Sequence, residues 1–236
     1  KAEYIYKNLL IQTNLIHSSY LSKVKKLIFL GSSCVYPKNC KQPIKEKYLL
    51  DGKLESTNDA YAIAKIAGVK MCQSYNDQYK TNFVSLMPTN TFGPNDNYNS
   101  KDSHFLPALI KKTHKIKNMK KPRLLVWGNG CAKRELIYVD DIADACIFFL
   151  NKNTKHSLIN IGTGKDHTIK FYARLLNKII CPNKNIKLAY DKKKPNGTPR
   201  KVLDVSLAKS YGWKARYNII EALKLTYEEF KKIRKK

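Results

Sequence analysis

Apolar residues follow two spacings in the first third of the chain. Residues 3 to 22 carry apolar side chains at helical spacing, which predicts an amphipathic helix. The apolar run of residues 26 to 30 ends at Gly31, Ser32 and Ser33, a pattern typical of a buried parallel strand with polar groups at its carboxyl end. Because α/β proteins bind ligands at that end of their strands, we expect functional side chains there.

The remaining pattern alternates helices and strands. Ser56, Thr57 and Asn58 offer caps for a helix that continues to about Tyr79, and a strand follows over residues 83 to 87. Further elements are expected as strands over 124–127 and 158–161 and as helices over 141–150, 169–180 and 217–234. This order predicts an α/β fold with a Rossmann-like, doubly wound parallel sheet and a smaller, interwoven α/β substrate domain.

One expected signal of such a sheet is missing. A dinucleotide-binding fold opens with a strand, a Gly-rich turn and a helix, and no GxGxxG or GxxGxxG sequence occurs in the chain. We therefore expect that the sheet is truncated at its N-terminal side. If two βαβ units precede Lys1, about 60 to 80 residues belong before it.

Charge and composition narrow the class of protein. The net charge of +27 raises the question of nucleic-acid binding, but 39 Lys and only 6 Arg are scattered through every segment, so no nucleic-acid partner is expected. No apolar run approaches the roughly 18 to 20 residues of a membrane span, and no signal peptide is evident, so we expect a cytoplasmic protein without a membrane partner. The six cysteines form no CxxC pair, and neither a metal site nor a disulfide framework is indicated.

Chemistry is suggested by Tyr61 and Lys65, which lie four residues apart on one face of the expected helix. A phenol ionises near pH 10, so a neighbouring ammonium that lowers its pKa would help it to exchange protons at neutral pH. Ser32, at the expected strand end, could hold a carbonyl oxygen beside it. Strand register does not decide between Ser32 and Ser33, and a YxxxK spacing alone also occurs by chance on surface helices.

Several segments together resemble the extended short-chain dehydrogenase/reductases that act on nucleotide sugars, and within them the GDP-L-fucose synthases. The resemblance covers essentially the whole chain. It rests on residues 30–37 (LGSSCVYP), 61–68 (YAIAKIAG), 87–90 (MPTN) with 92–94 (FGP), 103–104 (SH) and 196–201 (NGTPRK).

The resemblance implies an NADPH-dependent enzyme that converts GDP-4-keto-6-deoxymannose to GDP-L-fucose by 3,5-epimerisation and 4-reduction. Cys34 and His104 are similar to the acid and base of the epimerisation. Tyr61 would protonate the C4 oxygen, Ser32 would stabilise it, and Lys65 would bind the cofactor ribose and lower the pKa of Tyr61. The cofactor-binding residues implied are Lys65, Pro88, Thr89, Asn90 and His104.

For the GDP-sugar, the resemblance implies contacts from Lys112, Trp127, Arg134, Asn196 and Lys201. Basic groups suit a diphosphate, and an indole offers a stacking face. Other interpretations stay open: Cys34 as a core filler, His104 and Lys112 as solvated side chains, and Trp127 as a core residue.

The resemblance also implies a division of the chain and an assembly. Residues 1–95 would form the C-terminal part of the NADP-binding domain, and residues 96–236 mainly the substrate domain, with 135–165 returning to the first sheet. Family members are homodimers. The competing hypotheses are another nucleotide-sugar epimerase or dehydratase of the same superfamily, and an inactive fragment that acts as a basic binding protein.

Overall fold

The structure is a computed structural model that describes residues 1–99, 103–184, 186–194 and 196–233. The chain divides into two compact units, each assembled from three stretches of sequence. The first unit contains residues 1–89, 142–164 and 202–215. The second contains residues 90–141, 165–201 and 216–236.

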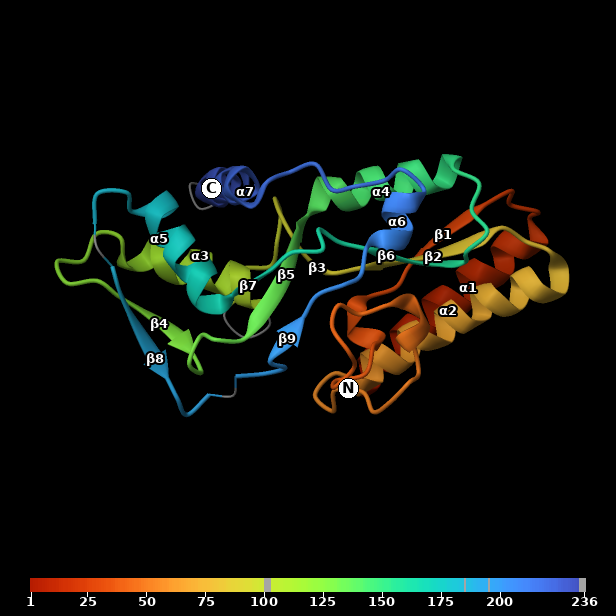
Figure 1. Cartoon of the computed structure of the whole chain (residues 1–236), viewed down its shortest axis with the longest axis horizontal. Coiled ribbons are helices and arrows are strands. Elements are labelled where there is room, and N and C mark those ends of the chain that lie inside the picture. The colour runs from red at the N-terminus through yellow and green to blue at the C-terminus, as the bar shows by residue number, and fades with distance from the viewer. Residues whose placement is uncertain (100–102, 185, 195, 234–236) are drawn as a thin grey trace. The chain divides into compact units, whose positions relative to one another are not determined.

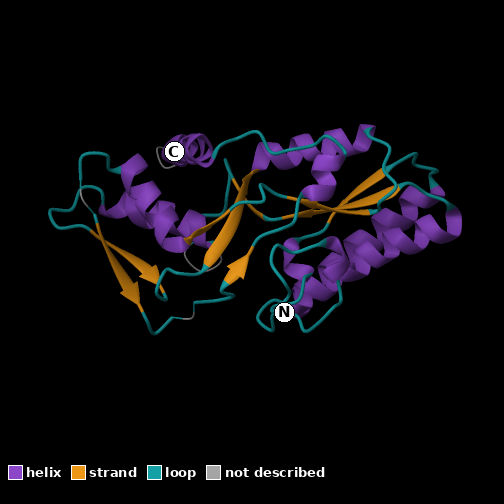
Figure 2. Ribbon diagram, viewed as in Figure 1, coloured by secondary structure: helices purple, strands orange, loops and turns teal. Residues whose placement is uncertain are grey.

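The first unit is built on a three-stranded parallel sheet with strand order β1-β2-β6 (Figures 1 and 2). Its strands are β1 (Leu27–Leu30), β2 (Phe83–Pro88) and β6 (Leu158–Ile161). Five of the six residues of β2 are buried, as expected for a central strand covered on both faces. The predicted parallel sheet of an α/β protein is therefore confirmed.

Two long helices of the first unit, α1 (Ala2–Leu21) and α2 (Asp59–Tyr79), lie side by side (Figure 1). Gly68 permits a close approach at this contact, because a Cβ there would lie 2.9 Å from the Gln12 side-chain oxygen. Both helices agree with the sequence prediction to within a few residues. The predicted side-chain cap of α2 is wrong: Asn58 is the N-cap residue, but its side chain makes no capping bond, and the Asp59 carboxylate accepts from the Ala60 amide instead.

The remaining elements of this unit are short except for α4 (Val139–Asn151), which begins in the second unit and continues into the first. The others are the 3-10 helices η1 (Ser33–Val35) and η2 (Glu46–Tyr48) and the helix α6 (Ser206–Ser210). Asn160 on β6 ties several of these segments together, since its side chain accepts from the Tyr36 hydroxyl at 2.6 Å and donates to the Ile44 carbonyl at 2.9 Å.

The second unit contains a mixed sheet, a parallel strand pair and three helices. The mixed sheet consists of β3 (Asn90–Phe92), β5 (Lys133–Tyr138), β7 (Asp166–Thr168) and β9 (Arg200–Lys201), and β5 pairs with all three others. The strand pair is β4 (Arg123–Trp127) with β8 (Lys187–Asp191). The helices are α3 (Phe105–Ile116), α5 (Ile169–Ile180) and α7 (Ile219–Ile233), and residue 234 of the last predicted helix lies outside the described residues.

The sequence pattern missed two central elements of the second unit. Helix α3 buries Leu106, Leu109 and Ile110, which have an amphipathic spacing in the sequence. The lysines that follow them obscure this helical pattern. Strand β5 was hidden because it begins with three charged residues, of which Glu135 is fully buried. Among the described residues, no helix is long and apolar enough to cross a membrane.

Candidate active site

The end of β1 brings backbone and side-chain groups together in a small space. The Gly31 amide donates to the Leu86 carbonyl of β2 at 2.9 Å, and a Cβ on Gly31 would overlap the Met87 sulfur, so only glycine fits here without a shift of Met87. The chain then turns into η1, where the Ser32 hydroxyl accepts a hydrogen bond from the Cys34 amide at 3.2 Å. Ser33 is buried, whereas Ser32 and Cys34 are only partly covered.

Helix α2 supplies Tyr61 and Lys65 to the same place. The Lys65 ammonium donates to the Leu30 carbonyl, the last residue of β1, at 2.9 Å. It lies 5.9 Å from the centre of the Tyr61 ring and 5.0 Å from that of Phe29. This contact fixes the amino group at the carboxyl end of the sheet, and burial lowers its pKa.

The pKa of Tyr61 differs from the expectation. Burial raises it, the negative charge of an ionised Cys34 adds to the rise, and hydrogen bonding with Ser32 opposes it. The expected lowering by Lys65 is therefore wrong for these residues by themselves, because desolvation of the phenolate outweighs the ammonium nearly 6 Å from the ring. Ser32, Cys34, Tyr61 and Lys65 lie within one unit and are called the Tyr61 group below.

The predicted nicotinamide segment lies where β2 ends. Thr89 is buried, and its amide donates to the Ile161 carbonyl of β6 at 3.0 Å, which extends the parallel sheet by one residue beyond Pro88. Asn90 begins β3 of the second unit, where its side-chain amide donates to the Glu135 carbonyl at 2.9 Å.

His104 belongs to the second unit and is the N-cap residue of α3. Its side chain is exposed and makes no capping bond, and its carbonyl accepts from the Ala108 amide at 3.1 Å. His104 is close enough to affect Asp96 electrostatically: burial raises the pKa of Asp96, and His104 partly counters that rise. The imidazole is therefore accessible and not a packed core group.

Trp127 is an exposed aromatic platform and not a core residue. Its side chain at the end of β4 is 57% exposed. The ammonium of Lys112 lies 5.4 Å from the indole ring and that of Lys194 5.2 Å from it. Lys194 was missed because it stands in a run of lysines with no distinguishing signal. Lys112, Trp127 and Lys194 are called the Trp127 group below.

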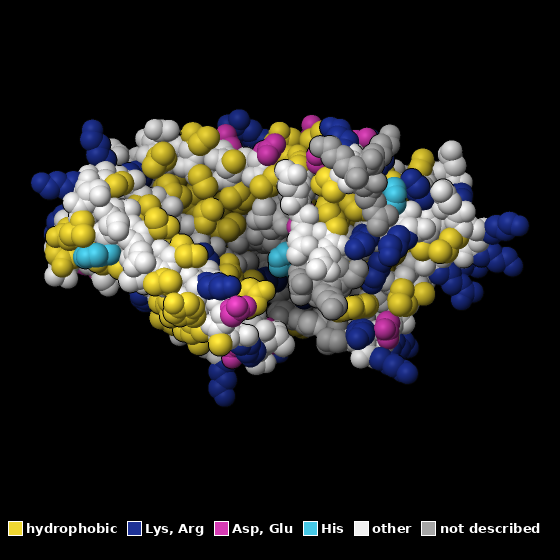
Figure 3. Space-filling model, turned by 180° about the vertical axis from the view of Figure 1, so that it is seen from behind, with side chains coloured by type: hydrophobic (Ala, Val, Ile, Leu, Met, Phe, Trp, Pro, Cys, Tyr) yellow, Lys and Arg dark blue, Asp and Glu magenta, His cyan; other side chains and the backbone are white. Residues whose placement is uncertain are grey.

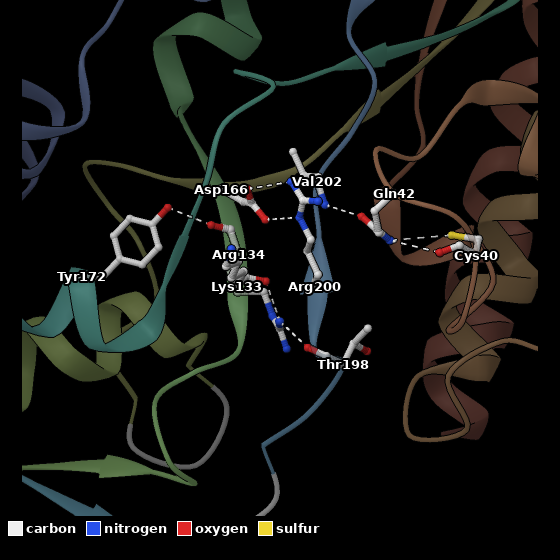
Figure 4. Close-up of polar contacts among 9 residues, drawn as sticks. All are labelled: Cys40, Gln42, Lys133, Arg134, Asp166, Tyr172, Thr198, Arg200 and Val202. Atoms are coloured by element: carbon white, nitrogen blue, oxygen red, sulfur yellow. Dashed lines mark hydrogen bonds and ion pairs between the residues drawn. The ribbon is translucent and has the colours of Figure 1, made fainter.

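Arg134, on β5, is held by the backbone of the segment that leads into β9. Its guanidinium donates to the Lys133 carbonyl at 2.8 Å and to the Thr198 carbonyl at 2.5 Å (Figure 4). A Cβ on Gly197 would lie 2.9 Å from this guanidinium, and Gly197 also has a positive φ of 69°, so a glycine suits the position twice over. Burial lowers the pKa of Arg134, which marks a partly desolvated cation.

Asp166 of β7 and Arg200 of β9 connect two strands that both pair with β5. Their side chains form a two-point contact of 2.6 and 3.2 Å (Figure 4). Lys201 pairs with Arg134 in the β5–β9 ladder, so the sequence-predicted cations Arg134 and Lys201 are register partners.

Asn196 closes the turn after β4. Its side-chain oxygen accepts from the Asn129 amide at 2.8 Å and lies against Gly128, where a Cβ would overlap it. Gly128 has a φ of 65°, a left-handed conformation that glycine adopts without cost. Asn196 therefore shapes the turn beside Trp127.

The described residues contain no set of side chains suited to hold a metal ion. Residues 1–99, 103–184, 186–194 and 196–233 contain no group of three or more His, Cys, Asp or Glu side chains that could hold an ion.

Comparisons with known proteins identify the family that this chain resembles. Residues 1–162 match the model of the NAD dependent epimerase/dehydratase family. The chain is 48% identical over 227 residues to "Putative GDP-L-fucose synthase 2" of Arabidopsis thaliana, covering 96% of this chain and 69% of that protein. It is 44% identical over 238 residues to the GDP-L-fucose synthase of Escherichia coli K12, covering 97% of this chain and 74% of that protein.

Solved structures extend the likeness to the fold. A GDP-mannoheptose C4 reductase from Campylobacter jejuni with NADP bound is 36% identical, with a TM-score of 0.87 over 98% of this chain and 77% of that one. A GDP-L-fucose synthetase from Naegleria fowleri bound to NADP is 26% identical, with a TM-score of 0.88 over 97% of this chain and 70% of that one. The Rossmann-type architecture is confirmed, and the chain belongs to the NAD dependent epimerase/dehydratase family.

Proposed function

We propose that this protein converts GDP-4-keto-6-deoxymannose to GDP-L-fucose by 3,5-epimerisation and NADPH-dependent reduction at C4. The observation that carries the proposal is the Tyr61 group, which collects a phenol, an ammonium, a hydroxyl and a thiol at the carboxyl end of β1. The relatives named GDP-L-fucose synthase and the NADP-bound solved structures support both the substrate and the cofactor.

The cofactor suits the residues at this sheet edge. Lys65 is fixed at the end of β1 and is suited to a ribose hydroxyl, while Pro88 and Thr89 end the neighbouring strand β2. We assign NADPH to Lys65, Pro88 and Thr89 of the first unit, and the family resemblance also implies Asn90 and His104 as cofactor contacts. When bound, NADPH supplies the hydride that reduces the C4 carbonyl.

Tyr61 acts as the proton donor in the reduction. Its raised pKa keeps the phenol protonated at neutral pH, the form required to give a proton to the C4 oxygen. Ser32 donates a hydrogen bond to the same oxygen as negative charge develops on it. Lys65 lies near enough to stabilise the phenolate that remains, and a solvent proton then restores Tyr61.

Cys34 and His104 carry out the epimerisation. The ketone at C4 acidifies the protons at C3 and C5, so one group removes a carbon-bound proton to give an enolate and the other returns a proton to the opposite face. Thiols and imidazoles suit both roles because they ionise close to neutral pH. Cys34 is partly exposed and His104 is exposed, so both are accessible for this exchange.

The second unit binds the GDP portion. Trp127 offers an exposed ring for stacking, and Lys112, Arg134 and Lys201 offer positive charge to the diphosphate. Asn196 shapes the adjoining turn.

A second candidate is a plain C4 reductase of another GDP-sugar. It is favoured by the 36% identity to the Campylobacter jejuni GDP-mannoheptose C4 reductase. The two candidates differ in whether the protons at C3 and C5 are exchanged.

The test uses the protein at its natural length with GDP-4-keto-6-deoxymannose in D₂O. Loss of NADPH absorbance reports reduction, and deuterium at C3 and C5 reports epimerisation. We expect both in the wild type, and Cys34→Ser should slow deuterium incorporation by about 100-fold or more. Reduction without exchange in the wild type would establish the second candidate, and absence of reduction in a folded protein would overturn both.

We also propose a homodimer formed through α1 and α2. The outer face of α1 exposes Leu10, Ile11 and Leu15 at 48, 60 and 60%, and Ile63 on α2 is 48% exposed. Sedimentation of Ile11→Glu/Leu15→Glu should give a monomer, whereas Lys152→Glu, at an exposed position outside both helices, should leave the dimer intact. A wild-type monomer would contradict the assignment.

A further inference from the structure

A cleft of about 870 Å³ opens beside helix α5 in the second unit. It is lined by residues of α5, of β8 and of the connection between them. Its rim carries Lys170, Arg174 and Lys178 from the helix, Lys184 from the connection and Lys187 from the strand. The volume is in the range of small-molecule sites, which is about 300 to 1,000 Å³.

The lining is more basic than the chain's composition explains. Five of the twelve lining residues are Lys or Arg, against 45 of 236 in the chain, and none of the twelve is Asp or Glu. On the face shown in Figure 3, by contrast, Lys and Arg side chains are spread among other residue types. The cleft therefore concentrates positive charge.

These charges lack internal compensation. In the part of the chain that the structure describes, Lys170, Arg174, Lys178 and Lys187 form no ion pair, and Lys184 donates to the Lys117 carbonyl at 2.7 Å. The three helix cations are spaced four residues apart, so their charges lie on one face of α5 and repel one another. An anion in the cleft would relieve this repulsion.

Beneath the rim, the floor is suited to an organic group. Cys181 and Ile186 are buried there, and Tyr190 presents an aromatic ring. Asn177 also lines the cleft and is only 7% exposed, and its side-chain oxygen has no hydrogen-bond partner among the described residues.

The cleft is distinct from the Trp127 group. Tyr190 pairs with the buried Val126, whereas Trp127 is the next residue of β4 and pairs with Asp191. Successive side chains of a strand point to opposite faces, so Tyr190 lies on the face opposite Trp127, whereas Lys187 lies on the face of Trp127. None of the residues that line the cleft belongs to the Trp127 group.

We propose that this cleft binds a small phosphorylated metabolite, with the phosphate on Arg174 and Lys178 and the organic part over Tyr190. Such a site is separate from the one assigned to the GDP-sugar. The phosphate supplies the missing negative charge.

The experiment is calorimetric titration of the protein at its natural length with pyrophosphate, ADP and glucose 6-phosphate in parallel. Each titration is repeated with the variant Arg134→Gln, which lacks one cation of the proposed GDP-sugar site. We expect saturable binding of at least one probe that survives Arg134→Gln and is about tenfold weaker in Arg174→Gln/Lys178→Gln. Tighter binding of ADP would indicate a nucleotide, and tighter binding of glucose 6-phosphate a sugar phosphate.

The matched control is Lys152→Gln/Lys155→Gln, which removes the same charge from exposed positions of the first unit. Its affinities should stay within about twofold of the wild type. Equal weakening in both double variants would mean a response to net charge, and that result, or no saturable binding of any probe, would overturn the proposal. Circular dichroism of each variant confirms that the fold is retained.

Discussion

The Tyr61 group and the Trp127 group solve different physical problems. In the first, Lys65 is held at the end of a parallel strand by a backbone contact of 2.9 Å, and the Tyr61 phenol is partly buried beside Ser32. In the second, two ammonium groups lie more than 5 Å from an indole that is 57% exposed. The proton transfer that we propose for the Tyr61 group needs fixed distances, which a site at the sheet provides, whereas the charge recognition that we propose for the Trp127 group tolerates a looser and wetter arrangement.

The largest effect is expected from removing the Tyr61 hydroxyl. Tyr61→Phe removes the proton donor, and we expect the rate of C4 reduction to fall by about 1,000-fold while the affinity for the GDP-sugar changes little. Single-turnover NADPH oxidation measures the rate. Tyr75→Phe is the matched control on the same helix, since it removes only a hydroxyl bonded to His17 and should leave the rate within about twofold. Equal rates in Tyr61→Phe and the wild type would remove Tyr61 from the chemistry.

The close packing beside the Tyr61 group depends on the absence of a side chain at Gly31. Gly31→Ala places a Cβ against Met87, and we expect the free energy of unfolding to fall by about 1 to 3 kcal/mol. Urea denaturation measures the loss. Gly52→Ala provides the comparison, because its nearest heavy atom is a Pro37 carbon at 3.3 Å and a smaller loss is expected. An unchanged midpoint in Gly31→Ala would mean that Met87 moves aside without cost.

Substitutions in the Trp127 group should change the binding of the GDP-sugar and not the chemical step. Trp127→Ala removes the stacking face, and we expect KM for the GDP-sugar to rise about tenfold while kcat stays within about twofold. Steady-state kinetics separate the two constants. Leu125→Ala, on the same strand and 44% exposed, should change neither. A fall in kcat alone would place Trp127 in the chemical step.

The smallest effect is expected at the Asp166–Arg200 pair. Arg200 lowers the pKa of Asp166, so the ionised carboxylate stabilises the folded state above about pH 4, and this contribution is lost as the pH falls through the lowered folded value. Asp166→Asn should cost about 0.5 to 1 kcal/mol at pH 7, a figure reduced because the Arg200 side chain is 46% exposed. Thermal unfolding at pH 7 and pH 3 measures it, and the difference from wild type should shrink at pH 3.

The control for this pair is Glu3→Gln, which removes a more exposed ion pair with Lys7 and should leave stability unchanged. A difference in Asp166→Asn that grows as the pH falls would contradict the linkage.

Sequence patterns predicted the sheet of the first unit well because its strands are apolar runs bounded by small residues. Leu158–Ile161 and Ile169–Ile180 were predicted with the bounds that the structure has. The second unit was predicted poorly, since β5 begins with Lys133, Arg134 and Glu135 and pairs with short polar strands. Local patterns do not record such tertiary pairing.

The site shows the same limit. Side chains near one another in sequence, such as Tyr61 and Lys65, were found from spacing, but the direction of the Tyr61 pKa shift was not, because it depends on burial. Lys194 beside Trp127 was equally invisible, since its sequence neighbours are also lysines.

The chain crosses between its two units at residues 89/90, 141/142, 164/165, 201/202 and 215/216. No single cut therefore releases either unit whole, and no single genetic crossover can exchange one unit for that of a relative. We expect a change of substrate preference to arise from substitutions in the second unit, to which we assign the GDP portion. Engineering a new specificity should likewise proceed by grafting loops and side chains and not by swapping domains.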